Sequence, residues 1–170
     1  MAASREALYH ALGGNGAVAE ALLAVRRLAS AGWREEIVGQ VVDAADPRLA
    51  QYLIGRLQNA HEERLHAVFL DADDRFIRDE QIAAGGRSNL SLRMRAIVRR
   101  AFELEAHKLI LAHNHPSGRA LASKEDRRAT ARLERVTREL ELVLVDHLIV
   151  GAGQAYSMRN NRLIILQNKH

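Results

Sequence analysis

The chain has 170 residues, of which 48% are hydrophobic and 27% are charged, so it can bury a core and lacks the composition of a disordered chain. It contains no cysteine, which excludes disulfides, iron–sulfur clusters, thiolate zinc sites and a cysteine nucleophile. A net charge of +4 with 4% aromatic residues allows an acidic partner but argues against a base-stacking surface for single-stranded nucleic acid.

The first 45 residues are predicted to form a small helical segment. Its apolar residues follow helical spacing: Val18, Leu22, Leu23, Val25 and Leu28. Residues 33–45 carry a second apolar stripe of the same period. Charges near the N-terminus interrupt the apolar run that a signal peptide needs, and no stretch approaches the roughly 20 apolar residues of a membrane span. We therefore expect a cytoplasmic protein without membrane contact, with a helical segment over 1–45 and a main domain over 46–170.

The main domain is predicted to mix strands and helices. A helix begins at Pro47, after the capping residue Asp46, and extends to about residue 59. Strands are expected at 63–70, 75–82, 108–112, 142–150 and 154–158, with an edge strand at 162–167. Amphipathic helices are expected at 91–106 and 123–140. This order predicts an α/β (α+β) domain.

A candidate metal site follows the strand at 108–112. His113 and His115 are two residues apart, so both side chains point to the same side of an extended chain and can bind one ion. Asp126 lies in the first turn of the next helix, where its carboxylate completes a set of three ligands. Two histidines and one carboxylate leave a fourth position for water, which is typical of catalytic zinc.

A purely structural interpretation of the same residues needs no metal. Ser123 and Asp126 match the capping pattern S-x-x-D before an apolar run, and a histidine at a strand end is commonly a polar loop residue. The joint pattern of H-x-H, seven residues, S, two residues and D is expected by chance on the order of once in a thousand such chains. The metal site is therefore favoured, and capping is compatible with it.

The pattern H-x-H-x7-S-x2-D resembles the signature of the JAB/MPN (JAMM) metalloproteases. The segments LILAHNHPSG, ending at Gly118, and VDHLIVGAG, ending at Gly153, are similar to the RadC-like branch of that superfamily. The resemblance covers about residues 46–163. It implies a JAB/MPN-like fold, which is a curved, mostly antiparallel sheet with flanking helices and zinc (Zn2+) at the sheet edge.

The resemblance also implies roles for individual residues. His113, His115 and Asp126 correspond to the zinc ligands, and Ser123 to the serine that helps to hold the attacking water or the oxyanion. The family's upstream glutamate corresponds best to Glu63, with the adjacent Glu62 as the alternative. The implied activity is zinc-dependent hydrolysis of a peptide or isopeptide bond in a protein or peptide substrate, through a zinc-activated water.

The chain departs from the family pattern at two places. Longer RadC-like chains carry a Gly-rich DNA-binding hairpin, whereas this chain has only the glycine cluster at 13–16. The family's Pro-Arg-Glu helix start is here Met94-Arg95-Ala96. A competing interpretation is therefore a DNA repair or recombination protein that binds zinc without hydrolysis. A metal nuclease is a weaker alternative, and the oligomeric state stays open.

The other histidines are predicted to have supporting or surface positions. His147, in an apolar strand, is expected to be buried and hydrogen-bonded, with a role beside the metal as the less favoured alternative. His61, His66 and His107 have no partner at ligand spacing and are expected at the surface. Arg128, Arg132 and Arg135 alternate with acidic residues along one helix, which predicts a solvated face or a weak phosphate contact.

Overall fold

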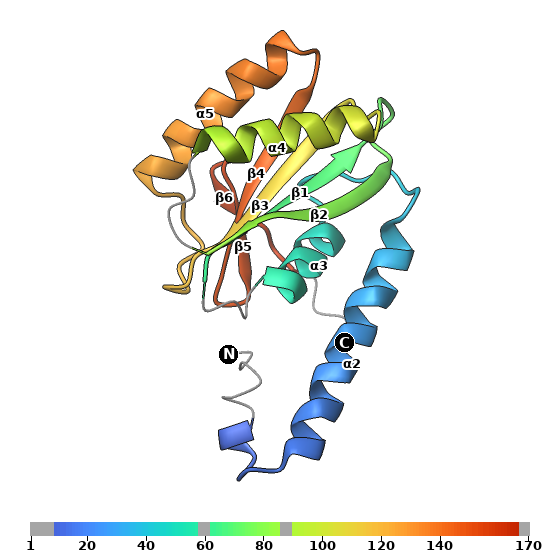
Figure 1. Cartoon of the computed structure of the whole chain (residues 1–170), viewed down its shortest axis with the longest axis vertical. Coiled ribbons are helices and arrows are strands. Elements are labelled where there is room, and N and C mark those ends of the chain that lie inside the picture. The colour runs from blue at the N-terminus through green and yellow to red at the C-terminus, as the bar shows by residue number, and fades with distance from the viewer. Residues whose placement is uncertain (1–8, 58–61, 86–89, 167–170) are drawn as a thin grey trace.

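A computed structural model describes residues 9–57, 62–85 and 90–166. It confirms the predicted mixed α/β class, with one mostly antiparallel sheet between helices (Figure 1). The strands are β1 (Arg64–Leu70), β2 (Phe76–Ala84), β3 (Lys108–Asn114), β4 (Val143–Gly151), β5 (Gln154–Ser157) and β6 (Arg162–Leu163). The helices are α2 (Gly16–Ile37), α3 (Pro47–Leu57), α4 (Leu90–Glu103) and α5 (Lys124–Glu139).

The order of strands in the sheet places the candidate metal site. The six strands run in the order β2-β1-β3-β4-β5-β6, and β3 and β4 are parallel while the other neighbours are antiparallel. Parallel neighbours need a crossover connection, and α5 supplies it. The start of α5 therefore lies beside the end of β3, so the helix start and the strand end meet at one edge.

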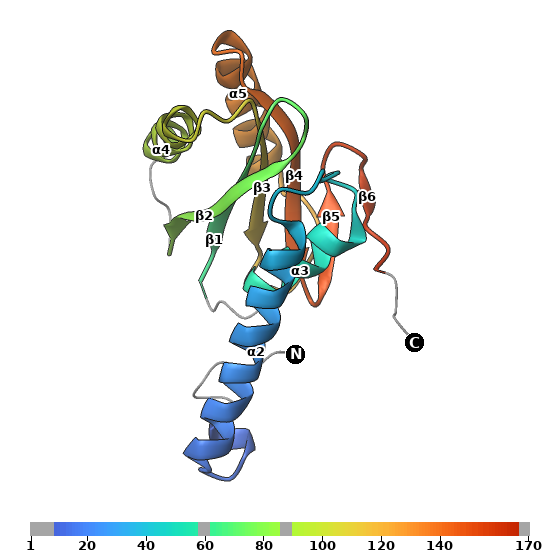
Figure 2. The ribbon, with the colours of Figure 1, turned by 90° about the vertical axis from the view of Figure 1, so that its right-hand side faces the viewer.

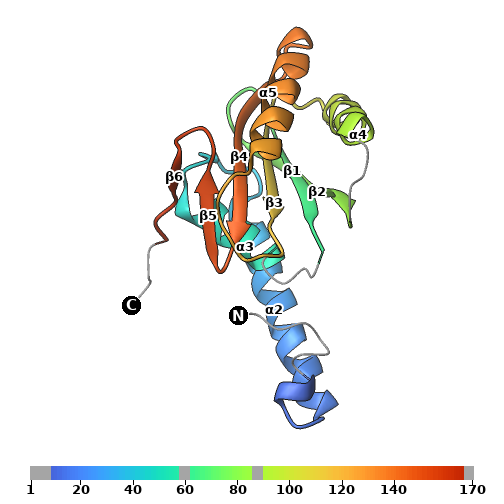
Figure 3. The ribbon, with the colours of Figure 1, turned by 90° about the vertical axis from the view of Figure 1, so that its left-hand side faces the viewer.

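Helices cover both faces of this sheet. Figures 2 and 3 show α4 and α5 on one face and α3 on the other. Because side chains alternate along a strand, Leu65, Ala67 and Phe69 of β1 pack with residues of α4 and α5. Val68 and Leu70, on the opposite face, pack against α3. Each helical layer thus has its own buried apolar cluster.

The N-terminal segment differs from the prediction. Residues 16–37 form one helix of 22 residues, but the helical stripe predicted over 33–45 was wrong beyond Ile37. Gly39 has a φ of 71°, which glycine adopts easily and which ends the helix. The chain then forms single bridges from Val38 to Phe76 and from Val41 to residue 75. Within the described residues no helix is long and apolar enough to span a membrane.

The predicted stripe of α2 is not covered by the described part of the chain. Val18, Leu22, Val25 and Leu28 are 42–72% exposed, and the helix extends away from the sheet (Figure 1). The helical conformation agrees with the prediction, and the helix carries these apolar side chains exposed.

Three histidines were predicted to lie at the surface, and the structure gives a different result for each of them. His66 is buried, with 3% of its surface exposed, so that prediction was wrong. Alternation turns it toward α3, where its Nδ1 lies 3.8 Å from Asp79 Oδ2. His107 is exposed as predicted, and His61 lies outside the described residues.

Candidate metal centre

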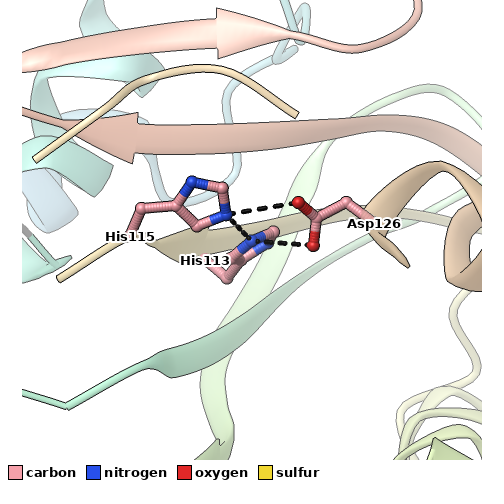
Figure 4. A group of neighbouring side chains, drawn as sticks. All are labelled: His113, His115 and Asp126. Carbon is pink, nitrogen blue, oxygen red and sulfur yellow. Dashed lines mark hydrogen bonds and ion pairs between the residues drawn. The ribbon is translucent and has the colours of Figure 1, made fainter. Parts of the chain in front are cut away.

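The three predicted ligands converge at the end of β3. The Nε2 atoms of His113 and His115 are 2.9 Å apart. The Asp126 carboxylate lies with Oδ1 3.2 Å from His113 Nε2 and Oδ2 3.2 Å from His115 Nε2 (Figure 4). Tetrahedral zinc with bonds of about 2.0–2.1 Å sets its ligand atoms roughly 3.3 Å apart. The spacing of these donors therefore fits a single small cation.

The capping interaction and the ligand cluster use the same carboxylate. Ser123 is the N-cap of α5, and its hydroxyl accepts a hydrogen bond from the Asp126 amide at 3.0 Å. The Ser123 amide and hydroxyl donate to Asp126 Oδ2 at 2.7 and 2.6 Å. The predicted capping pattern is confirmed, and it aims the carboxylate at the two imidazoles.

The charge states of these groups are strongly perturbed. Burial acts to raise the pKa of the Asp126 carboxyl, but hydrogen bonds from His113, His115 and Ser123 together lower this pKa well below its ordinary value. The pKa of His115 is raised, first by its hydrogen bond to Asp126, against the opposing effect of burial. Asp126 is therefore an anion at neutral pH and favours positive charge beside it.

The two candidate glutamates, which come just before β1, have different surroundings. Leu65 is paired with His113 in the antiparallel register, so Glu63 comes opposite His115. Glu63 lines a small cavity of about 60 Å³ together with His113 and Asp126, and its Oε1 lies 3.3 Å from Arg93 Nη1.

Glu62 does not line this cavity. Its Oε1 lies 3.5 Å from Nη2 of Arg64. Of the two glutamates, Glu63 is the one on the face of the candidate metal centre.

Asn114, between the two histidines, holds Glu63 in register. Alternation turns its side chain to the opposite face of β3, where Oδ1 accepts from the Arg64 amide at 2.8 Å. Its Nδ2 donates to the Glu62 carbonyl at 3.1 Å. Both neighbours of Glu63 are thus tied to β3. The sequence pattern contained Asn114, but only the strand pairing reveals this contact.

His147 of β4 extends the centre inward through hydrogen bonds. Its Nε2 lies 2.8 Å from His113 Nδ1 and its Nδ1 lies 2.6 Å from Thr130 Oγ1. The Thr130 hydroxyl donates to the Asp126 carbonyl at 2.7 Å, so it accepts from His147 Nδ1–H. His147 Nε2 then accepts from His113 Nδ1–H, so Nε2 is the nitrogen of His113 that would bind a metal ion once it has lost its own proton.

His147 is neutral in this arrangement. Burial, followed by the charge of His113, lowers the pKa of His147 to about 3. The prediction of a buried, hydrogen-bonded histidine is confirmed, and the structure adds its direct contact with a candidate ligand.

Replacing His147 with phenylalanine is expected to weaken zinc binding by about 10–100-fold, because partners that orient a ligating histidine have effects of that size. Competition with a chromogenic chelator measures this affinity. The control is His66→Phe, which makes the same change at an equally buried histidine on the α3 side of the sheet. Equal affinities for the two variants would contradict an orienting role for His147.

Gly151, at the end of β4, lets the loop after the histidines approach the sheet. A Cβ atom at this position would lie 2.6 Å from the Gly118 carbonyl oxygen and 2.6 Å from the Arg119 carbonyl carbon. Such distances require the backbone to move. This contact joins two segments that are distant along the chain, so it leaves no local signal in the sequence.

We expect Gly151→Ala to displace this loop, with a loss of about 1–3 kcal/mol in unfolding free energy and weaker zinc binding. Thermal denaturation and metal titration measure the two effects. Gly32→Ala is the control, because a Cβ at Gly32 meets nothing within 4 Å. Full zinc affinity and unchanged stability in Gly151→Ala would show that the loop does not depend on this contact.

Comparison with known proteins gives consistent similarities. A family model described as the RadC-like JAB domain matches residues 44–163. A UPF0758 protein of Acidithiobacillus ferrooxidans is 40% identical over 112 residues, which cover 66% of this chain and 50% of that protein. A UPF0758 protein of Marinomonas is 31% identical over 164 residues, covering 96% and 73%. The chain thus spans about half the length of the former relative.

Proposed function

The chain belongs to the family of RadC-like JAB domains, and from this premise we propose that it is a zinc-dependent hydrolase of peptide or isopeptide bonds. One observation carries the proposal. His113, His115 and Asp126 present three donor atoms to one point, and Glu63 lies on the same face of the sheet. A site of this composition would combine a bound metal with a carboxylate base.

The donor set fits zinc. Two imidazole nitrogens and one carboxylate oxygen are ordinary zinc ligands, and they leave a fourth position open. The side chains of His115 and Asp126 are 18% and 16% exposed, so solvent reaches this position. A bound zinc ion would supply Lewis acidity toward a substrate carbonyl and lower the pKa of a water molecule to about 7.

Glu63 is proposed as the general base. Its carboxylate would take a proton from the attacking water as the oxygen–carbon bond forms. It would then deliver this proton to the leaving nitrogen as the carbon–nitrogen bond breaks. Arg93, at 3.3 Å, orients the Glu63 carboxylate.

Ser123 is proposed to have two roles. In the structure its hydroxyl proton is donated to Asp126 Oδ2, so it first orients a ligand. Donation to the oxyanion that develops on the substrate requires the proton to turn away from Asp126.

Binding of nucleic acid without hydrolysis is the alternative function. Arg128, Arg132 and Arg135 of α5 are exposed, which provides positive charge for phosphate contacts. Binding of duplex and branched DNA that weakens steeply as salt rises, with bound zinc but without cleavage of any peptide or isopeptide, would favour this function.

The hydrolase proposal is tested by removing and restoring the metal. The purified chain is treated with a chelator, dialysed, and assayed against a panel of peptide and lysine-linked isopeptide substrates. We expect hydrolysis to disappear and to return with about one equivalent of zinc, because the site holds a single ion. Hydrolysis that persists at full rate without metal would refute the proposal.

A further inference from the structure

A second potential binding site lies between α4 and α5, which are side by side on one face of the sheet (Figure 3). This inter-helix groove has a volume of about 730 Å³. Its apolar lining includes Val98 of α4, Val136 of α5 and Leu140, the C-cap residue of α5. Val136 is 36% and Leu140 39% exposed. The groove therefore presents apolar surface to solvent, and burial of that surface by a partner would stabilise a complex.

The charged side chains that line the groove are all positive. Arg95, Arg99 and Arg132 line it, and no acidic side chain of the described residues does. Arg99 lies 3.6 Å from Glu103 in an exposed pair within α4. Within the described residues neither Arg95 nor Arg132 forms an ion pair. A ligand of the groove is therefore expected to combine apolar groups with negative charges.

The inter-helix groove adjoins the candidate metal centre. Met94 lines the groove and also the small cavity that contains Glu63, His113 and Asp126. The residue before it, Arg93, contacts Glu63. A chain bound in the groove would thus lie one side chain away from the cavity of the metal centre.

We propose that the inter-helix groove binds an acidic segment of a partner protein. Carboxylates of the segment pair with Arg95 and Arg132, while aliphatic side chains pack on Val136 and Leu140. A duplex nucleic acid fits less well, because its phosphates would reach the arginines but leave the apolar lining without apolar contacts. The proposal concerns binding alone and does not require the chain to be a hydrolase.

The test uses a short fluorescein-labelled peptide of alternating glutamate and leucine, with fluorescence anisotropy as the measurement on the full chain. We expect saturable binding that weakens with salt. Replacing the leucines of the peptide with serine is expected to abolish it. The double variant Arg95→Glu, Arg132→Glu should lose at least about tenfold in affinity, because repulsion replaces attraction at both positions.

The matched control is the double variant Arg128→Glu, Arg135→Glu. It makes the same charge change on exposed residues of α5 that do not line the groove, and it should bind the peptide like the wild type. Equal losses in both double variants, absence of peptide binding, or preferential binding of duplex DNA through Arg95 and Arg132 would each overturn the proposal. If charge reversal unfolds the chain, by circular dichroism, the corresponding glutamine variants give the same comparison.

Discussion

Replacing His113 with alanine is expected to reduce bound zinc from about one ion per chain to almost none. The change removes one of three protein ligands, so its effect should exceed the roughly 100-fold upper range for loss of an outer partner. It also removes the contact through which His147 orients the site. The metal content of the purified protein and a chelator competition both measure the result.

The control for this experiment is His66→Ala. His66 is as buried as His113 and belongs to the adjacent strand, so its replacement creates a comparable cavity without touching the candidate ligands. This variant is expected to retain its zinc even if it is less stable. Equal zinc in the wild type and in His113→Ala would eliminate the metal site.

Replacing Glu63 with glutamine is expected to leave zinc binding intact and to lower turnover by about 10²–10⁴-fold, the usual contribution of a general base. Glutamine keeps the size and one oxygen of glutamate, but it does not take a proton at neutral pH. Because Glu63 is not among the three converging ligands, the metal content should not change. Steady-state kinetics on a substrate that the wild type cleaves measure the loss.

Glu62→Gln provides the matched control, because it makes the same change one residue away, at a side chain that does not line the cavity of the metal centre. It should keep both zinc and turnover. Full activity in Glu63→Gln would exclude Glu63 as the base. If only Glu62→Gln lost activity, the role of general base would be assigned to Glu62.

The sequence predicts those parts of the fold and site that depend on local spacing. The alternation along 63–70 and the apolar run at 142–150 predict two strands, which the structure has as β1 and β4, because strand periodicity is visible within one segment. His113, His115 and Asp126 could be grouped because a strand, a loop and a helix start follow one another along the chain. For the same reason the capping pattern at Ser123 was recognised.

Features that depend on packing between distant segments were not predicted. Asn114 contacts residues about 50 positions away, and Gly151 is constrained by a loop that precedes α5. The apolar stripe at 33–45 has helical period, but Gly39 ends the helix and the following residues pair with β2. The sequence predicts His66 at the surface, because its contact with the buried side chain of Asp79 joins two different strands and leaves no local signal.

The capping box at the start of α5 has a consequence for the thermodynamics of metal uptake. Ser123 fixes the Asp126 carboxylate through two hydrogen bonds to Oδ2, and a third bond joins the Asp126 amide to the Ser123 hydroxyl; none of the three needs an ion. The entropy of ordering this ligand is therefore lost during folding and not during coordination. Such preorganisation favours tight binding, and it allows the helix to keep its first turn when the ion dissociates.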